Sequence, residues 1–140
     1  MRTPALILAA VLALAAAHPA LAEGDAKVEN ADQSVKISPV ALPVVVDGHL
    51  ANYVFVTVKV LLNPGANALA LSDKEPYFRD ALVRAAHRTP FMIKGDYNHI
   101  DEAKLAAALY PEAARIAGPG AVRGIIVLSQ QAQHRVASQR

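Results

Sequence analysis

The most constraining feature of this sequence is a run of alternating side chains. Between residues 53 and 62 a valine or leucine stands at every second position, with tyrosine, phenylalanine, threonine and lysine between them. A period of two is typical of a β-strand with one buried face. Asp47-Gly48 separates this run from an earlier apolar run, and such a pair predicts a two-residue hairpin turn. The run is therefore expected to be the second strand of a hairpin, with its valines in the core.

Prolines and helical spacing predict the other main elements. The run 39–46 contains two prolines, which fits an edge strand. Apolar residues at helical spacing predict a helix over 76–88. Residues 72–75 have the Ser-x-x-Glu spacing of a capping box, but Pro76 fits the first helical position better, which makes Glu75 or the preceding turn the cap. A second helix is expected to begin at Asp101, and Pro111 is expected to kink or restart it. The continuously apolar run 121–128 predicts a last strand in the interior of the sheet, with a bulge or close contact at its glycine.

These elements predict an α+β fold: a small antiparallel-rich sheet of three or four strands with two helices packed on one face. Residues 91–93 are interpreted as a buried corner and residues 94–98 as a turn. The expected organisation is a cleaved secretory signal peptide at 1–22, a flexible leader at 23–37, a single α+β domain at 38–130 and a flexible tail at 131–140.

The N-terminal residues match the pattern of a secretory signal. A basic residue, Arg2, precedes the apolar segment 5–17, and an Ala-Leu-Ala sequence ends at Ala22. The alternative is an uncleaved membrane anchor, but this segment is shorter than the roughly 20 residues of a bilayer span and is followed by His18-Pro19. We predict cleavage after Ala22, a periplasmic location, and no stable membrane span in the mature chain.

Composition and motifs argue against several classes of function. The chain has 140 residues and no cysteine, which indicates one domain without disulfides, thiol chemistry or cysteine-ligated metals. A net charge of +2 gives no electrostatic case for nucleic acid. No serine stands in a nucleophile elbow, and Gly118-Pro119-Gly120 follows a predicted helix instead of opening one as a phosphate-binding loop does. The adjacent Asp101 and Glu102 are interpreted as first-turn acids of a helix. We predict a non-enzymatic protein without a cofactor.

Three residues make the best candidate for a metal site. His87, Asp96 and His99 would come together if the chain reversed its direction near residues 94–95. No fourth ligand suggests itself, so exposed histidines and no bound metal are the expectation. A small ligand-binding or metal-binding module at this corner is kept as the alternative function.

The order of these elements resembles the soluble domain of the FliL-like flagellar basal-body-associated proteins. The matching segments cover about residues 40–130 and are Leu-Pro-Val-Val-Val at 42–46, Tyr-Val-Phe-Val-Thr-Val-Lys-Val at 53–60, Pro-Tyr-Phe-Arg-Asp-Ala-Leu-Val at 76–83 and Val-Arg-Gly-Ile-Ile-Val-Leu at 122–128. The resemblance implies a non-enzymatic domain similar to the stomatin/prohibitin type, which packs side by side into rings and contacts the stator of a flagellar motor. The sequence departs from the family at its N-terminus, where members usually keep a cytoplasmic tail and a spanning helix.

The predicted function is therefore protein–protein interaction or self-assembly in the periplasm. The expected partners are second copies of the chain and an envelope or flagellar protein. Two surfaces are the candidates for contact, because an edge strand can accept another strand and a charged helix face can set its register. They are the edge formed by Val44, Val45 and Val46, and the helix face that carries Arg79, Asp80 and Arg84. An enzyme whose site is assembled from scattered residues is the remaining alternative.

Overall fold

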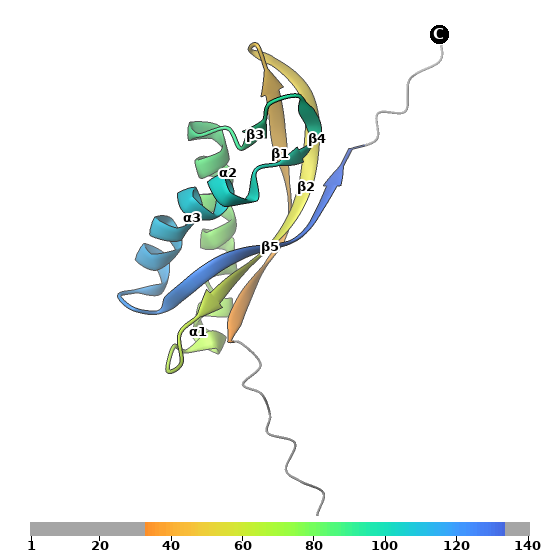
Figure 1. The fold of residues 1–140 in the computed structure, drawn as a ribbon. Coiled ribbons are helices and arrows are strands. Elements are labelled where there is room, and N and C mark those ends of the chain that lie inside the picture. The colour runs from red at the N-terminus through yellow and green to blue at the C-terminus, as the bar shows by residue number, and fades with distance from the viewer. Residues whose placement is uncertain (1–32, 134–140) are drawn as a thin grey trace, which may run out of the picture.

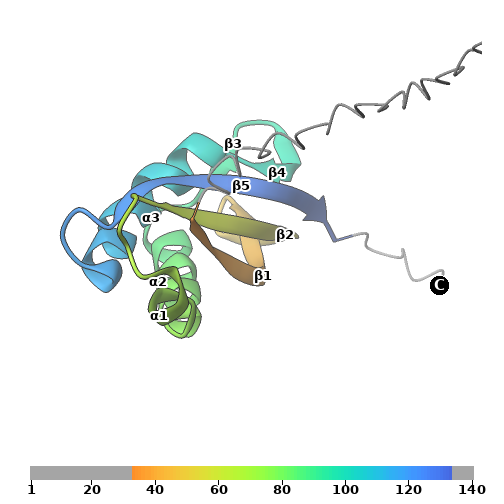
Figure 2. The ribbon, with the colours of Figure 1, turned by 90° about the horizontal axis from the view of Figure 1, so that it is seen from below.

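The computed structural model describes residues 33–133, which form a three-stranded antiparallel sheet with helices on one face (Figures 1 and 2). This arrangement confirms the predicted α+β class. The predicted signal peptide, most of the predicted leader and residues 134–140 of the tail lie outside the described residues. In chain order the elements are β1 (Ser34–Val46), β2 (His49–Leu62), α1 (Ala68–Ser72), α2 (Glu75–Arg88), β3 (Met92–Ile93), β4 (Asp96–Ile100), α3 (Glu102–Ala117) and β5 (Val122–Ala132).

The β1–β2 hairpin forms as predicted. Asp47 and Gly48 have φ values of 49° and 78°, as a two-residue turn of this kind requires. The stripe of alternating apolar residues on β2 is buried, whereas Tyr53 and Phe55 on the other face are exposed. β2 is the central strand, since the order in the sheet is β1-β2-β5. The edge position predicted for the 39–46 run is confirmed as well.

The predicted leader is wrong for its last residues. β1 begins at Ser34, and Val35 and Ile37 are both buried in the core. These residues pair with Val60 and Val58 of β2. Polar neighbours hide the alternation of this segment in the sequence, and only the pairing with β2 makes its apolar residues a buried row.

The predicted interior position of the last strand is also wrong. β5 pairs only with β2 and forms the second edge of the three-stranded sheet. Its apolar run is continuous because Ile125 and Val127 pack against the core while Ile126 and Leu128 face outward. The strand continues to Ala132, so the first two residues of the predicted tail belong to the sheet. The bulge expected near Gly124 is present, with Arg123 as the extra residue between the pairs Leu61–Gly124 and Leu62–Val122.

Helix α2 matches the prediction closely, but its start differs in detail. Pro76 occupies the first turn, as expected, while the N-cap is Lys74 and makes no side-chain cap hydrogen bond. The Ser72 hydroxyl instead donates to the Ala68 carbonyl, and a Glu75 carboxylate oxygen accepts from the Ser38 N–H at 2.8 Å. The capping box is therefore not formed, because Glu75 accepts from β1, and the cap lies in the preceding turn, as the position of Pro76 predicted. The short helix α1 was not predicted.

Helix α3 runs through Pro111 without interruption. Its N-cap is Asp101, whose carboxylate accepts from the Lys104 N–H at 3.1 Å, and Glu102 lies in the first turn as predicted. Leu109 and Ala113 are buried on either side of the proline. Their packing keeps both halves of the helix on the core, so the helix does not restart at the proline.

Residues 92–100 form a small hairpin where the sequence predicted a corner and a turn. Met92–Ile93 and Asp96–Ile100 pair as β3 and β4 around Gly95, which has a φ of 83°. Phe91 is buried, as the corner interpretation required. The Gln130 side chain bonds the backbone N–H and carbonyl of Ile100 at 2.8 and 3.3 Å, which attaches the hairpin to β5. This support comes from a distant strand, so local turn propensity did not reveal it.

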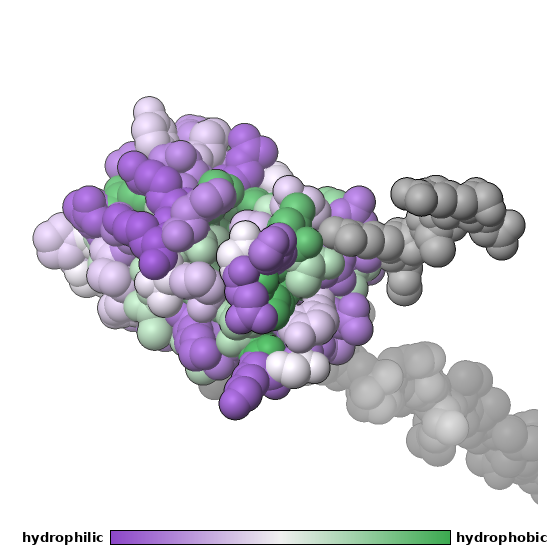
Figure 3. All heavy atoms as spheres, turned by 90° about the horizontal axis from the view of Figure 1, so that it is seen from above, coloured by the Kyte–Doolittle hydropathy of each residue, from purple (hydrophilic) through white to green (hydrophobic). Residues whose placement is uncertain are grey.

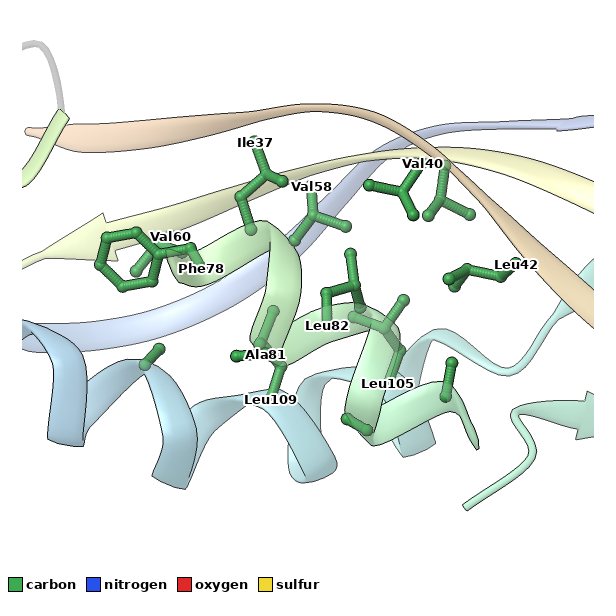
Figure 4. Packing of buried hydrophobic residues seen from close by; sticks show 14 of the residues in the cluster. Ile37, Val40, Leu42, Val58, Val60, Phe78, Ala81, Leu82, Leu105 and Leu109 are labelled. Atoms are coloured by element: carbon green, nitrogen blue, oxygen red, sulfur yellow. The ribbon is translucent and has the colours of Figure 1, made fainter. Parts of the chain in front are cut away.

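The core lies between the sheet and the two long helices (Figure 4). Phe78 and Leu82 of α2 and Leu105 and Leu109 of α3 meet the buried row of β1 and β2. Within residues 33–133, no helix is long and apolar enough to cross a membrane. Seen from the end that carries the β1–β2 turn, a narrow hydrophobic strip reaches the surface between polar residues (Figure 3).

Candidate protein-interaction surface

A groove separates the outer side of β1 from the first half of α2. It has a volume of about 460 Å³ and is open to solvent. The two elements approach each other because α2 packs its buried face on the sheet and Glu75 bonds the β1 backbone at Ser38. The lining residues are Pro39, Val40, Ala41, Pro76, Arg79, Asp80 and Val83. The groove thus lies between the edge strand β1 and two residues of the predicted helix face, Arg79 and Asp80.

The three charged residues of the helix face differ in their surroundings. Asp80 and Arg84 form an exposed i,i+4 ion pair at 3.0 Å. Arg79 lines the groove, and its guanidinium has no hydrogen-bond or ion-pair partner among residues 33–133. An exposed pair contributes little to stability, about 0.3–0.5 kcal/mol. Arg79 is therefore the charge on this face that is available to a partner.

The edge of β1 offers few backbone donors beside the groove. The Ser38 N–H is bonded to Glu75, and Pro39 and Pro43 have no N–H. Pro43 is paired with Tyr53, and the Tyr53 carbonyl accepts from the Gln133 N–H on the β5 side. The two residues therefore exchange no backbone hydrogen bond, and the Pro43 carbonyl points to the outer edge of the sheet. Prolines at such positions protect an edge from strand addition. Contact here is expected through side chains more than through an added strand.

The predicted valine edge lies beyond the groove, toward the hairpin turn. Val44 is buried in the core, Val46 is half-buried, and Val45 is 36% exposed. Arg84 does not line the groove either. The structure therefore brings Arg79 and Asp80 to β1 at residues 39–41 and not at residues 44–46.

The sequence interpretation missed the apolar lining of the groove. Pro39 and Ala41 come from β1, and Pro76 and Val83 come from α2, so no local pattern joins them. The one available signal was the first proline of the 39–46 run, Pro39. Pro39 lies in a register shift between Ile37 and Val40, where the strand departs from regular pairing with β2.

The three residues of the candidate metal site do not assemble. The His99 Nδ1 lies 2.8 Å from an Asp96 carboxylate oxygen, whereas the His87 Nδ1 lies 2.8 Å from the Val83 carbonyl of its own helix. No group of three metal-ligating side chains occurs in the part of the chain that the structure describes. Asp96 and His99 therefore lie together, and His87 does not join them.

Asp96 belongs to a polar pocket at the β3–β4 hairpin. Ala51, Asn52, Gly95, Tyr97, Asn98 and Gln133 complete its lining. The buried Asn52 amide donates to the Tyr97 carbonyl at 3.0 Å, and its oxygen accepts from the Tyr53 N–H at 2.8 Å. Asn52 therefore attaches the hairpin to β2 and has its hydrogen bonds satisfied within the fold. The sequence analysis did not identify this role of Asn52, because the residue lies just before the alternating run of β2 and belongs to no motif.

The Asp96 carboxylate predicts a pH dependence of stability. The Asn98 N–H and then the His99 ring hold the pKa of Asp96 below its usual value. A lowered folded pKa gives stability that is present above the unfolded value, about 3.9, and is lost as pH falls through the folded pKa. We expect Asp96→Asn to lower the free energy of unfolding at pH 7 and to have a smaller effect below pH of about 3.

Urea denaturation at several pH values measures this difference. Asp73→Asn is the matched control, since the exposed Asp73 carboxylate has no hydrogen-bond partner among residues 33–133. A loss of stability in Asp96→Asn that is the same at pH 7 and pH 3 would contradict the assignment.

Comparison with known proteins identifies no related protein. No protein-family model matches the chain, and a search of curated proteins finds no match. The resemblance to the FliL-like proteins therefore stays a prediction from the sequence segments.

Proposed function

We propose that this protein acts in the bacterial periplasm by protein–protein contact, including assembly with copies of itself, and that it performs no catalysis. The observation that carries the proposal is the groove between β1 and α2, where Arg79, which has no partner among residues 33–133, lies beside an apolar lining. An apolar centre with an arginine is the usual composition of a contact between proteins. The contact is made by side chains of the groove together with the exposed Val45 of the neighbouring edge.

The FliL-like resemblance suggests which complex the partner belongs to. Under it, the partner is a component of the flagellar basal body or of another envelope complex, and copies of the domain pack side by side. The two edges of the sheet, β1 and β5, lie on opposite sides of β2. A domain with two different contact sides is suited to head-to-tail packing, which closes into a ring when the rotation allows it.

The first experiment measures assembly and location together. The full chain is expressed in a bacterial host, the product is purified from the periplasmic fraction, and its mass is determined. We expect the mass of a chain cleaved after Ala22, and a concentration-dependent oligomer by size-exclusion chromatography with light scattering, with or without a chelator. A product that remains in the membrane fraction at full mass would contradict the periplasmic assignment.

The double variant Arg79→Glu/Arg84→Glu tests the helix face. We expect it to move the assembly midpoint to about tenfold higher concentration, equivalent to about 1.4 kcal/mol, because the partner loses contact with Arg79 and meets a reversed charge. The matched control is Lys94→Glu/Lys104→Glu, which changes the net charge equally on exposed residues outside the groove. Assembly that the Arg79 and Arg84 changes leave untouched would exclude this face.

A further inference from the structure

The face of the sheet that turns away from the helices has an unusual charge composition. β1, β2 and β5 contain Lys36, Lys59 and Arg123 but no aspartate or glutamate. The helices cover only the opposite face, as the two ribbon views show (Figures 1 and 2). The acidic residues of the described chain therefore lie in the turns, the helices and β4. The three strands therefore carry basic residues and no acidic ones.

Two lysines on this face stand directly opposite each other. Lys36 of β1 pairs with Lys59 of β2. The Leu62 N–H donates to the Gln33 carbonyl, so Gln33 and Leu62 are a hydrogen-bonded pair of the ladder. Hydrogen-bonded and non-hydrogen-bonded pairs alternate, and the Lys36–Lys59 pair, three positions along, is therefore non-hydrogen-bonded. Side chains are closest at such positions, with Cβ atoms about 4.5–5.5 Å apart. Like charges in this arrangement destabilise the sheet.

Neither lysine has a counter-charge. Among residues 33–133, the Lys36 and Lys59 ammonium groups have no hydrogen-bond or ion-pair partner. Lys36 is exposed and Lys59 is half-buried, so a ligand above the sheet can reach both. Two adjacent unpaired ammonium groups are suited to one or two carboxylates.

Large apolar side chains are exposed on the same face as the lysine pair. Ile126 of β5 stands opposite Lys59 on the same face and is 40% exposed. Four residues farther along β2 on the same face, Phe55 is 42% exposed, and Tyr53, two residues beyond it, is 37% exposed. The outer face of an antiparallel sheet is usually polar, so this group of side chains is an exposed apolar patch beside a basic pair.

We propose that this open face binds an acidic segment of a partner protein, with carboxylates on Lys36 and Lys59 and an apolar side chain against Phe55 and Ile126. A second copy of the same face offers no carboxylate and would bring lysines against lysines. An anionic lipid surface is recognised by clusters of about four to eight basic residues, more than this face carries. Charge complementarity therefore favours the acidic protein segment. The proposal uses a different surface from the β1–α2 groove and does not depend on it.

The binding experiment uses a defined peptide probe. The protein is the product purified after expression of the full chain. The probe is a fluorescein-labelled peptide in which glutamate alternates with phenylalanine and leucine, and its counterpart carries lysine in place of glutamate. We expect the acidic peptide alone to bind by fluorescence anisotropy, more weakly at high salt. Lys36→Glu/Lys59→Glu is expected to weaken binding about tenfold, as the loss of two exposed ion pairs predicts. Lys94→Glu/Lys104→Glu and Arg79→Glu/Arg84→Glu are the matched controls and should leave it unchanged.

The single variant Lys36→Glu separates binding from folding. It replaces a like-charge pair by an opposite-charge pair with Lys59, so the melting temperature is expected to rise by roughly 1–4 °C while peptide binding falls. A fold defect would lower both quantities. A fall in melting temperature would contradict the arrangement of the two lysines.

Three results would overturn the proposal. The first is equal binding of the acidic and basic peptides, or no binding of either. The second is an equal loss of binding in the control variants. The third is lysine-dependent binding to phosphatidylglycerol vesicles without binding to the acidic peptide, which would assign the face to lipid. Since the Arg79 and Arg84 variant reports separately on assembly, failure of one proposal is distinguishable from failure of the other.

Discussion

Phe78→Ala is expected to lower the free energy of unfolding by about 3–5 kcal/mol. Phe78 has no exposed surface and lies on α2 between the sheet and α3 (Figure 4). Removing the ring leaves a cavity that the sheet cannot collapse to fill, because β1 and β2 are held by their ladder. Urea denaturation should show a lower midpoint with an unchanged slope.

Tyr77→Ala is the control for Phe78→Ala. Tyr77 is adjacent in sequence and also aromatic, but it is 65% exposed. Its removal is expected to change the free energy of unfolding by no more than about 0.5 kcal/mol. Similar losses in both variants would contradict the orientation of α2.

Val58→Asp is expected to abolish the fold at pH 7. Val58 is fully buried on the central strand and pairs with Ile37 on one side and Val127 on the other. Burial shifts the pKa of a carboxyl group upward by as much as 3–5 units. At pH 7 the resulting ionisation penalty is limited to about 4 kcal/mol by the distance from the unfolded pKa of about 3.9, and burying an unbonded polar group in place of valine adds about 1–3 kcal/mol. The whole stability of a domain is about 5–15 kcal/mol. Circular dichroism should therefore show a largely unfolded chain.

Two further measurements test the cause of this loss. The folded population of Val58→Asp should increase as the pH is lowered toward 5, because the introduced carboxyl group becomes neutral. Thr57→Asp places the same side chain on the open face, where Thr57 is half-buried, and should remain folded. Unfolding of both variants at every pH would indicate a general intolerance of the strand and contradict the assigned faces.

The elements predicted correctly are those whose signals are local. The alternation of β2 places Val58 inward and Phe55 outward because successive side chains of a strand point to opposite faces. Asp47 and Gly48 adopt positive φ in the turn, and Pro76 lies in the first turn of α2. Each of these features depends on residues a few positions apart, so the sequence contains the whole physical cause.

The incorrect predictions share a different cause. Val35 and Ile37 become a strand through pairing with β2, and Pro111 stays within one continuous helix through the packing of α3 on the core. Both outcomes depend on contacts that outweigh local preference. The edge position of β5 likewise follows from the arrangement of the sheet, because a continuous apolar run is compatible with either an edge or an interior place.

The candidate site divides in the same way. The sequence by itself determined that Arg79 and Asp80 lie on one charged turn of a helix, that a proline-containing strand forms an edge, and that the β2 lysine faces away from the valines. The tertiary structure alone decided that the helix turn meets the edge at Pro39 and that Lys36 stands opposite Lys59. Side-chain periodicity is set within a few residues, whereas the groove and the lysine pair require segments more than twenty residues apart to adopt one register around a shared core.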